Sequence, residues 1–301
     1  MEEYPRTLLE FEQQFGTEKA CLEYLYKIRW PEGFKCPQCG HRKAWNTGRN
    51  LYRCVHCDFQ SSVTTGTMFQ DTKKPLRLWF RAMWHVTSQK YGANALGLQR
   101  ILGLGSYHTA WIWMHKMRYA MVRPGRDRLS GLVEVDETFI GGERHGKRGR
   151  GAEGKALVVV AVETNDGRIG RIRLKRKPDA SFQSLGGAVK NAVEPGSTVC
   201  TDDWSGYCDL SKSGYRHKII RKESAVGENL LPGANRVASL LKRWLLGTYQ
   251  GGMQHSHLDY YLDEFTFRFN RRTSRSRGKL FYRLIQHAVA IDPVLAKDIH
   301  G

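Results

Sequence analysis

The sequence lacks any long hydrophobic run. Nowhere in its 301 residues is there a stretch approaching the roughly 18 apolar residues that a membrane-spanning helix needs. Its first ten residues, MEEYPRTLLE, are polar and acidic and lack the basic start and apolar centre of a secretory signal. These absences exclude membrane partners and predict a cytoplasmic protein. Because 41% of the residues are hydrophobic, the chain can still bury folded cores, which excludes a disordered tail protein.

Acidic residues are scarce in the middle of the chain. The whole chain carries 48 Lys and Arg against 29 Asp and Glu, a net charge of +19. Residues 60–131 hold 11 basic side chains and only 2 acidic ones. An ordinary solvated face would mix both signs, so the imbalance favours a nucleic-acid-binding surface and a nucleoid-associated protein.

The sequence lacks the features of a disulfide framework, because its seven cysteines are an odd number and there is no secretion signal. Four of them form two CxxC pairs, Cys36 with Cys39 and Cys54 with Cys57. Each pair can present two thiolates on one side of a tight turn, and two such turns complete a tetrahedral site for Zn²⁺. We therefore predict a zinc ribbon over residues 18–59; the alternative is a pair of redox dithiols.

Helical periodicity follows the ribbon. Apolar residues at helical spacing predict helices that begin at Pro75, at Asn94 and at Ser106, the last two separated by a glycine-containing turn. This layout is typical of a helix-turn-helix DNA-binding domain, here over residues 60–122, although a plain three-helix core unit has the same pattern. The third helix would direct its first residues to bases and later ones to phosphates, and the candidates are Tyr107, His108, Thr109, Lys116 and Arg118.

Strand patterns begin after a linker at residues 123–131. We predict strands over 132–140, 156–163 and 167–174, a helix over 181–192 and a strand over 198–201. This order resembles a ribonuclease-H-like mixed sheet. Asp136 in the first strand and Asp202 after the fourth are candidate ligands for catalytic metal ions, and Glu134, on the same strand face as Asp136, is a weaker one.

A helix predicted over residues 233–246 carries two more candidates. Asn235 and Lys242 are seven residues apart and so project from one side of the helix. An amide oxygen can coordinate a hard cation, and a lysine can grip a phosphate. The alternative reading of this side is a solvated helix surface.

Five blocks occur in an order that is similar to a known family. The chain resembles the bacterial insertion-sequence transposases that carry a zinc ribbon before a DDE-type domain, over about residues 5–290. The blocks are CPQCG (36–40), EVDETFIGG (134–142), TDDWSGY (201–207), SLLKR (239–243) and YLDEFTFRFNRR (261–272).

The resemblance implies a multi-domain α/β protein with a catalytic domain over 132–292. It maps the catalytic acids onto Asp136 and Asp202, and it maps the third position, often Glu in the family, onto Asn235. The family's conserved lysine falls on Lys242, and the implied catalytic cofactor is Mg²⁺ or Mn²⁺. Asp203 and Glu228 are alternative ligands if Asn235 does not serve.

The implied function is that of a DNA transposase, which cuts the ends of a mobile element and joins them to target DNA. Its partners would be the terminal inverted repeats, the target DNA and at least one further copy of the chain. Tail helices over 256–270 and 278–290, with Arg271 and Arg272, are expected to hold DNA phosphates. The alternatives are a DNA-binding regulator with an idle catalytic face and a nuclease built on the same core.

Overall fold

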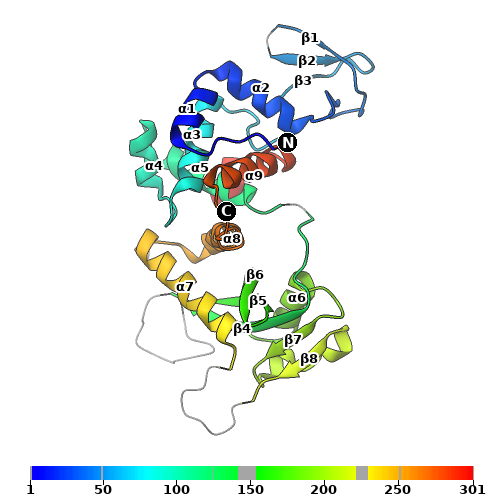
Figure 1. The fold of residues 1–301 in the computed structure, drawn as a ribbon, viewed down its shortest axis with the longest axis vertical. Helices are drawn as coiled ribbons and strands as arrows, with labels where there is room; N and C mark the ends of the chain where they lie inside the picture. Colours follow the sequence, from blue (N-terminus) through cyan, green and yellow to red (C-terminus); the bar gives the residue numbers. More distant parts are fainter. Residues whose placement is uncertain are drawn as a thin grey trace. The chain divides into compact units, whose positions relative to one another are not determined.

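The computed structural model divides into two compact units (Figure 1). Unit 1 combines Met1–Gly125 with Thr273–Gly301, and unit 2 is Arg126–Arg272. The structure describes residues 2–48, 50–123, 125–141, 154–221, 230–250 and 252–300. Within these residues, no helix is both long enough and apolar enough to cross a lipid bilayer.

Unit 1 is built mainly from helices that bury aromatic side chains. The three helices predicted in its basic segment are confirmed, and α3 buries Leu76, Trp79, Phe80 and Met83, the residues that gave its apolar period. The helices of this unit are α1 (Leu8–Gln14), α2 (Glu18–Arg29), α3 (Leu76–Ser88), α4 (Ala95–Leu102), α5 (Tyr107–Ala120), α9 (Arg277–Ala290) and α10 (Ala296–His300).

The pair α4 and α5 is joined by a short turn. Asn94 caps α4 by accepting a hydrogen bond from Gly97 N, and Gly103 ends it with a φ of +62°. Glycine adopts this left-handed conformation without strain, which is why the helix stops there. The chain then enters α5 at Tyr107, as predicted.

The three-stranded antiparallel sheet of unit 1 lies between α2 and α3 in the sequence. Its strands are β1 (Ala44–Asn46), β2 (Leu51–Cys54) and β3 (Gln60–Ser62), with β2 in the centre. Tyr52 of β2 packs on Trp30 and Tyr26, with ring centroids 5.6 and 5.3 Å apart. This aromatic contact attaches the small sheet to the end of α2.

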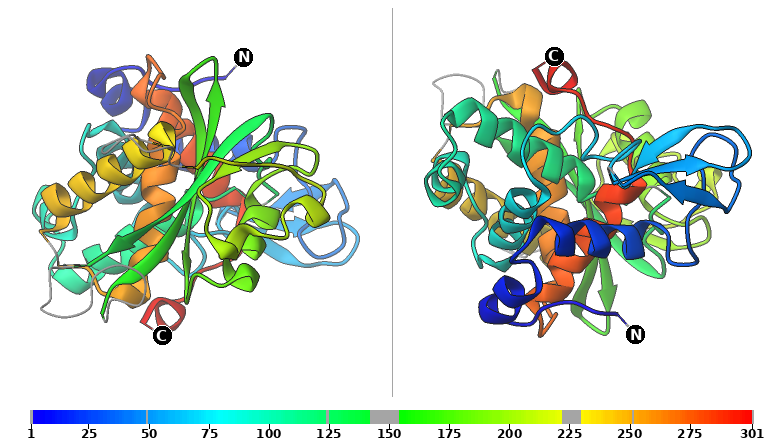
Figure 2. Two further views of the ribbon diagram at one scale, coloured as in Figure 1. Left: turned by 90° about the horizontal axis from the view of Figure 1, so that it is seen from below. Right: turned by 90° about the horizontal axis from the view of Figure 1, so that it is seen from above.

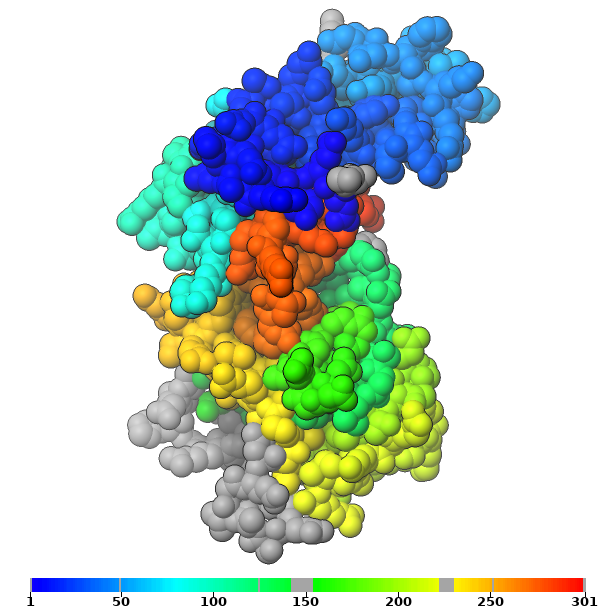
Figure 3. Space-filling view, viewed as in Figure 1, coloured from blue at the N-terminus to red at the C-terminus, as the bar shows by residue number. Residues whose placement is uncertain are grey.

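Helix α9 belongs to unit 1, although we expected the catalytic domain to extend to residue 292. It packs with α2, α3 and α5 in unit 1, and Figure 3 shows its orange-red atoms lying against the blue N-terminal helices. Phe281 is fully buried there, with ring centroids 5.5 Å from Phe11 and 5.7 Å from Phe80. Because Phe281 completes an aromatic core formed by residues about 200 to 270 positions earlier, local sequence patterns could not assign it.

Unit 2 is a mixed five-stranded sheet with the order β6-β5-β4-β7-β8. The strands β4, β5 and β6 run antiparallel to one another, and β7 and β8 continue the sheet in parallel to β4. Their bounds are β4 (Leu132–Ile140), β5 (Ala156–Asn165), β6 (Arg168–Lys177), β7 (Thr198–Thr201) and β8 (Arg216–Ile219). This order and direction confirm the predicted ribonuclease-H-like core.

Helices cover both faces of this sheet (Figure 2). One face packs on α6 (Phe182–Ala192), where Val133 and Val135 of β4 meet Leu185. The other face packs on α7 (Pro232–Tyr249) and α8 (Leu258–Phe269). Since β4 alternates between the two cores, its even-numbered residues from 134 face α7 and its odd-numbered residues face α6.

The linker predicted at residues 123–131 is shorter in the structure. Leu129 is fully buried, accepts a hydrogen bond from Glu194 N and donates its own N–H to Ala192 O. Ser130 N donates to the Glu163 carboxylate at 2.9 Å. These contacts make residues from Arg126 onward part of unit 2, because an apolar side chain within the predicted linker finds a place in the core.

Candidate functional site

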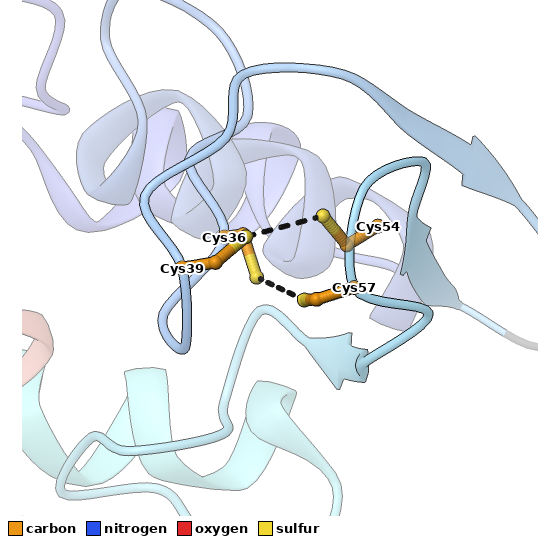
Figure 4. A group of neighbouring side chains, drawn as sticks. All are labelled: Cys36, Cys39, Cys54 and Cys57. Atoms are coloured by element: carbon orange, nitrogen blue, oxygen red, sulfur yellow. Dashed lines mark hydrogen bonds between the residues drawn. The ribbon is translucent and has the colours of Figure 1, made fainter.

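The four predicted zinc ligands come together in unit 1 (Figure 4). The sulfur atoms of Cys36, Cys39, Cys54 and Cys57 all lie within 4.8 Å of one another. Cys36 Sγ is 3.7 Å from Cys57 Sγ, and Cys39 Sγ is 3.6 Å from Cys54 Sγ. A tetrahedral ZnS₄ centre with Zn–S bonds of about 2.3 Å has sulfur–sulfur edges of about 3.8 Å, so the cluster fits zinc.

The two CxxC turns have the same backbone design. Gly40 N donates to Cys36 O in the first turn, and Asp58 N donates to Cys54 O in the second. Gly40 and Asp58 each follow their pair in the left-handed region, with φ of +75° and +57°. Both turns thereby point two thiols to the same side.

The environment of Cys36 favours a thiolate. Burial raises its pKa, but hydrogen bonds from the Cys39 and Gln38 backbones outweigh this effect, and the pKa of Cys36 falls to about 7. Contacts among the four thiols raise the pKa of Cys39, and that of Cys57 to about 12, so one thiolate at Cys36 is favoured within the group.

The two predicted catalytic acids stand just beyond the paired part of two neighbouring strands in unit 2. The parallel pairing of β4 with β7 ends at Glu134 opposite Cys200; Asp136 follows Glu134 by two residues, and Asp202 follows Cys200 by two, directly after β7 ends. Cys200 belongs to the core that α7 covers, so alternation along each strand turns both carboxylates toward the α7 face. Two carboxylates carried by neighbouring strands suit a hard divalent cation such as Mg²⁺.

Asp202 is held by the residues that follow it in the TDDWSGY block. Its carboxylate accepts a hydrogen bond from Trp204 N at 3.2 Å, and the Trp204 indole donates to Ala180 O at 2.9 Å. Gly206 is required for this packing, because a Cβ there would lie 2.6 Å from Ala180 O and 2.8 Å from Leu185 Cδ1. The block therefore forms a rigid turn that fixes the position of the acid.

Tyr207 joins this turn to the strand that carries Asp136. Its side chain is fully buried, and its hydroxyl donates to Glu137 Oε2 at 2.9 Å. Burial raises the pKa of Tyr207 well above its usual value, and the carboxylate of Glu137 raises it further. The charges of Asp136 and Asp202 act in the same direction, so both acids lie within electrostatic reach of one phenol. Sequence reasoning missed this link, although the tyrosine stands inside a block that it had singled out.

Helix α7 carries the remaining two candidates. Ala234, Val237 and Leu241 face the sheet, while Asn235 and Lys242 are exposed on the adjacent side of the helix. Asn235 directly follows a residue that touches β4, because Ala234 N donates to Glu134 Oε2 at 2.9 Å. Lys242 lies two turns further along the same side, as the sequence predicted.

Of the two alternative acids, the structure describes only Asp203. Asp203 forms an exposed ion pair with Arg221, with Oδ2 3.1 Å from Nε, and Glu228 lies outside the described residues. Within the described part of the chain, the four cysteines are the only group of three or more His, Cys, Asp or Glu that converges as metal ligands do.

The first turn of α5 presents the residues predicted to meet DNA bases. Tyr107 and His108 are exposed, and Thr109 is partly buried. Lys116, further along α5, is also partly buried, and burial lowers the pKa of its ammonium group.

Arg118 was expected to reach DNA phosphates, and this expectation is wrong. It is only 2% exposed, with Nη1 3.5 Å from Nε2 of the fully buried His115. The helix turns Arg118 inward, a direction that the charge of an arginine does not reveal.

Arg271 and Arg272 serve the structure of unit 2. The Arg271 guanidinium lies 4.1 Å from the Phe267 ring centroid, and the Arg272 guanidinium lies 4.2 Å from that of Phe269. Arg272 also donates to the carbonyl oxygens of Gly170, at 3.1 Å, and Ile169. Arg272 thus attaches the end of α8 to β6, and Arg271 packs on a ring of α8 itself.

Comparisons with known proteins match both parts of the chain. Residues 128–270 match the ISXO2-like transposase domain, and residues 16–60 match a transposase zinc-ribbon domain. The first match contains the two aspartates and the α7 candidates, and the second contains the four cysteines.

Individual relatives are more distant. The "uncharacterized protein in transposable element ISH50" of Halobacterium salinarum is 26% identical over 288 residues, which cover 88% of this chain and 94% of that protein. The catalytic core domain of BIV integrase is 18% identical, with a TM-score of 0.33, over 50% of this chain and 89% of that one. A simian T-cell lymphotropic virus intasome, solved in complex with PP2A regulatory subunit B56 gamma, contains a chain that is 15% identical, with a TM-score of 0.35. The match covers 66% of this chain and 71% of that one. With its zinc-ribbon and transposase-domain matches, the chain belongs to the insertion-sequence transposases that join a transposase zinc ribbon to an ISXO2-like transposase domain.

Proposed function

We propose that this transposase binds the terminal repeats of its element and catalyses metal-dependent strand cleavage followed by strand transfer to target DNA. The observation that carries the proposal is the parallel pairing of β4 with β7, which brings the strand of Asp136 beside the strand that leads into Asp202. The assignment of Asn235 is supported by its neighbour in the first turn of α7, Ala234, whose N–H is bonded to Glu134 of β4.

Asp136, Asp202 and Asn235 would hold Mg²⁺ or Mn²⁺, and the donor set of two carboxylates and one amide oxygen fits such cations. When bound, the metal supplies activation of water for cleavage and of the freed 3′-hydroxyl for transfer. Glu137 and Tyr207 keep the two aspartates in register, and Lys242 binds a phosphate of the DNA on the same side of α7. Cleavage and transfer by this route require no covalent bond between the enzyme and the DNA.

DNA recognition is assigned to unit 1. The α4–α5 pair has the layout of a helix-turn-helix, and the exposed Tyr107 and His108 at the start of α5 are in the position from which such helices contact bases. The zinc ribbon provides a second contact with the ends of the element. Two element ends must be processed together, so the active form is at least a dimer on nucleoid DNA.

The test uses the purified protein, Mn²⁺ or Mg²⁺, and DNA that carries the flanking terminal repeats. We expect nicking at the element ends and joining to a target duplex, and we expect Asp136→Asn to abolish both. Asp166→Asn is the matched control, because Asp166 is an exposed turn residue of the same unit, with a φ of +49° that Asn tolerates. Cleavage that survives Asp136→Asn would refute the assignment of the acids.

The second candidate function is a DNA-binding regulator with an idle catalytic face. The observation that favours it is the neutral Asn235 at the position where the family often has an acid. Specific binding of the terminal repeats by a wild-type protein that cuts nothing in either metal would select this function.

A further inference from the structure

Helix α7 begins without a capping side chain of its own. Its N-cap residue, Leu231, is apolar and makes no cap hydrogen bond. Pro232 has no N–H, and the first intrahelical bond runs from Asn235 N to Leu231 O at 3.0 Å. Gly233 and Ala234 are therefore the first-turn residues whose N–H groups find no acceptor inside the helix, and both residues are buried.

Glu134 supplies the missing acceptor from a strand 100 residues earlier. Its Oε2 accepts the hydrogen bond of Ala234 N at 2.9 Å. A carboxylate at a helix N-terminus is also stabilised by the positive end of the helix dipole. The contact thus performs for α7 the work of a capping residue, but it does so from β4.

Gly233 makes room for this carboxylate. A Cβ on Gly233 would lie 2.9 Å from Glu134 Oε2, closer than real Cβ atoms approach an oxygen, so the carboxylate would have to shift. Elsewhere in the same helix, Gly247 has nothing within 4 Å of its Cβ position. Glycine at 233 therefore leaves the carboxylate in its present position, whereas glycine at 247 meets no such neighbour.

We propose that Glu134 is a positioning residue that locks Asn235 against Asp136. Glu134 stands two residues before Asp136 on the same face of β4, and its bond to Ala234 fixes the turn that carries Asn235. One carboxylate thereby connects the strand of one metal ligand to the helix of another. The inference rests on the proposed function of Asp136 and Asn235, and it assigns Glu134 a role other than metal ligand.

The first measurement does not depend on activity. In the full-length protein, amide hydrogen exchange of the peptide that begins α7 reports the bond to Ala234. We expect Glu134→Ala to accelerate this exchange about tenfold or more, because the amide loses its acceptor. Glu134→Gln retains an amide oxygen that can accept the bond, and we expect near wild-type protection. Unchanged exchange in Glu134→Ala would overturn the proposal.

The second measurement is the rate of DNA end cleavage. We expect Glu134→Ala and Gly233→Ala each to lower it about 10- to 100-fold, as is typical when the support of a metal ligand is removed. Glu134→Gln should stay within about threefold of wild type, because the supporting hydrogen bond is kept. Gly247→Ala is the matched control in the same helix and should leave the rate unchanged.

A double-mutant cycle separates positioning from direct ligation. If Glu134 acts through Asn235, Glu134→Ala should cost no more than about twofold in a protein that already carries Asn235→Ala. Two results together would identify Glu134 as a metal ligand and overturn the proposal. The first is that Glu134→Ala lowers the cleavage rate of the Asn235→Ala protein as much as it lowers that of wild type. The second is that the Glu134→Gln protein needs more Mn²⁺ than wild type to reach its half-maximal rate.

The two proposals fail in different ways. A wild-type protein that cuts no DNA would refute the proposed function, while the exchange measurement would still decide whether Glu134 holds α7. If wild type is active and Glu134→Ala changes neither the amide exchange of α7 nor the cleavage rate, the positioning role is refuted and the transposase function is not.

Discussion

Replacing Tyr207 with Phe removes a single hydroxyl from the interior of unit 2. That hydroxyl donates to Glu137 Oε2 at 2.9 Å, and the tyrosine is fully buried. A hydrogen bond to a charged group stabilises a protein by about 1.5–3 kcal/mol, and its loss leaves the carboxylate without this donor. We therefore expect Tyr207→Phe to lower the free energy of unfolding by about 2 kcal/mol, and Tm by about 4–8 °C for a unit of this size.

The loss should reach the active site, because Tyr207 joins the turn that holds Asp202 to the strand that holds Asp136. Tyr215→Phe is the matched control: Tyr215 is also buried in unit 2, but its hydroxyl donates to the backbone carbonyl of Val193 at 3.2 Å, outside the site. We expect the control to lose about 1 kcal/mol of stability and no cleavage rate, whereas Tyr207→Phe loses both.

Alkaline titration sharpens the same prediction. The pKa of Tyr207 is raised in the folded state, so the contribution of its phenol to stability is complete below pH 10, the usual tyrosine value, and declines above it. The decline is about 1.4 kcal/mol per pH unit, so the advantage of wild type over Tyr207→Phe should vanish about 1.5 units above pH 10. Calorimetry and end cleavage in parallel are the assays. Equal Tm and equal rates for Tyr207→Phe and Tyr215→Phe would refute the reasoning.

Three further predictions concern the cysteine cluster, Arg118 of α5 and Asp203. Cys54→Ser should abolish zinc binding and unfold the ribbon, as measured by zinc content and circular dichroism, while Cys208→Ser, an exposed cysteine outside the cluster, should change neither. Arg118→Ala should lower Tm by several degrees because the side chain is buried, yet leave the salt dependence of DNA binding unchanged; a fall of about 1 in the slope of log K against log salt would show a phosphate contact instead. Asp203→Asn should keep full cleavage and lose at most about 1 kcal/mol of stability, since its ion pair with Arg221 is exposed; an inactive Asp203→Asn protein would make Asp203 a ligand.

Elements with a local period were predicted well. The helix after Pro75 and the strand at 132–140 lie where the sequence placed them, because apolar residues every three to four or every two positions follow directly from backbone geometry. The zinc cluster was predictable for a similar reason, since a CxxC turn sets the direction of two thiols by itself.

Side-chain direction and long-range packing were harder to predict. The charge of Arg118 indicated a surface residue, but α5 turns it inward beside His115. Arg272 binds the carbonyl oxygens of β6, a contact that its residue type does not reveal, and its predicted role in holding DNA stays a prediction. In both cases the neighbours of the arginine in the fold are distant from it in the sequence or lie on a helix side that its charge does not indicate.

The sequence by itself determined the cluster of four cysteines and the order of the main helices and strands, and it singled out Asp136 and Asp202 as candidate acids. Only the tertiary structure decided that Glu134 caps α7, that Tyr207 bonds to Glu137, and that α9 belongs with the N-terminal helices. The physical reason is range: backbone geometry dictates periodicity within a few residues, whereas these contacts join residues 70 to 100 or more positions apart. Which buried donor meets which carboxylate is settled only when the surfaces of the folded chain pack together.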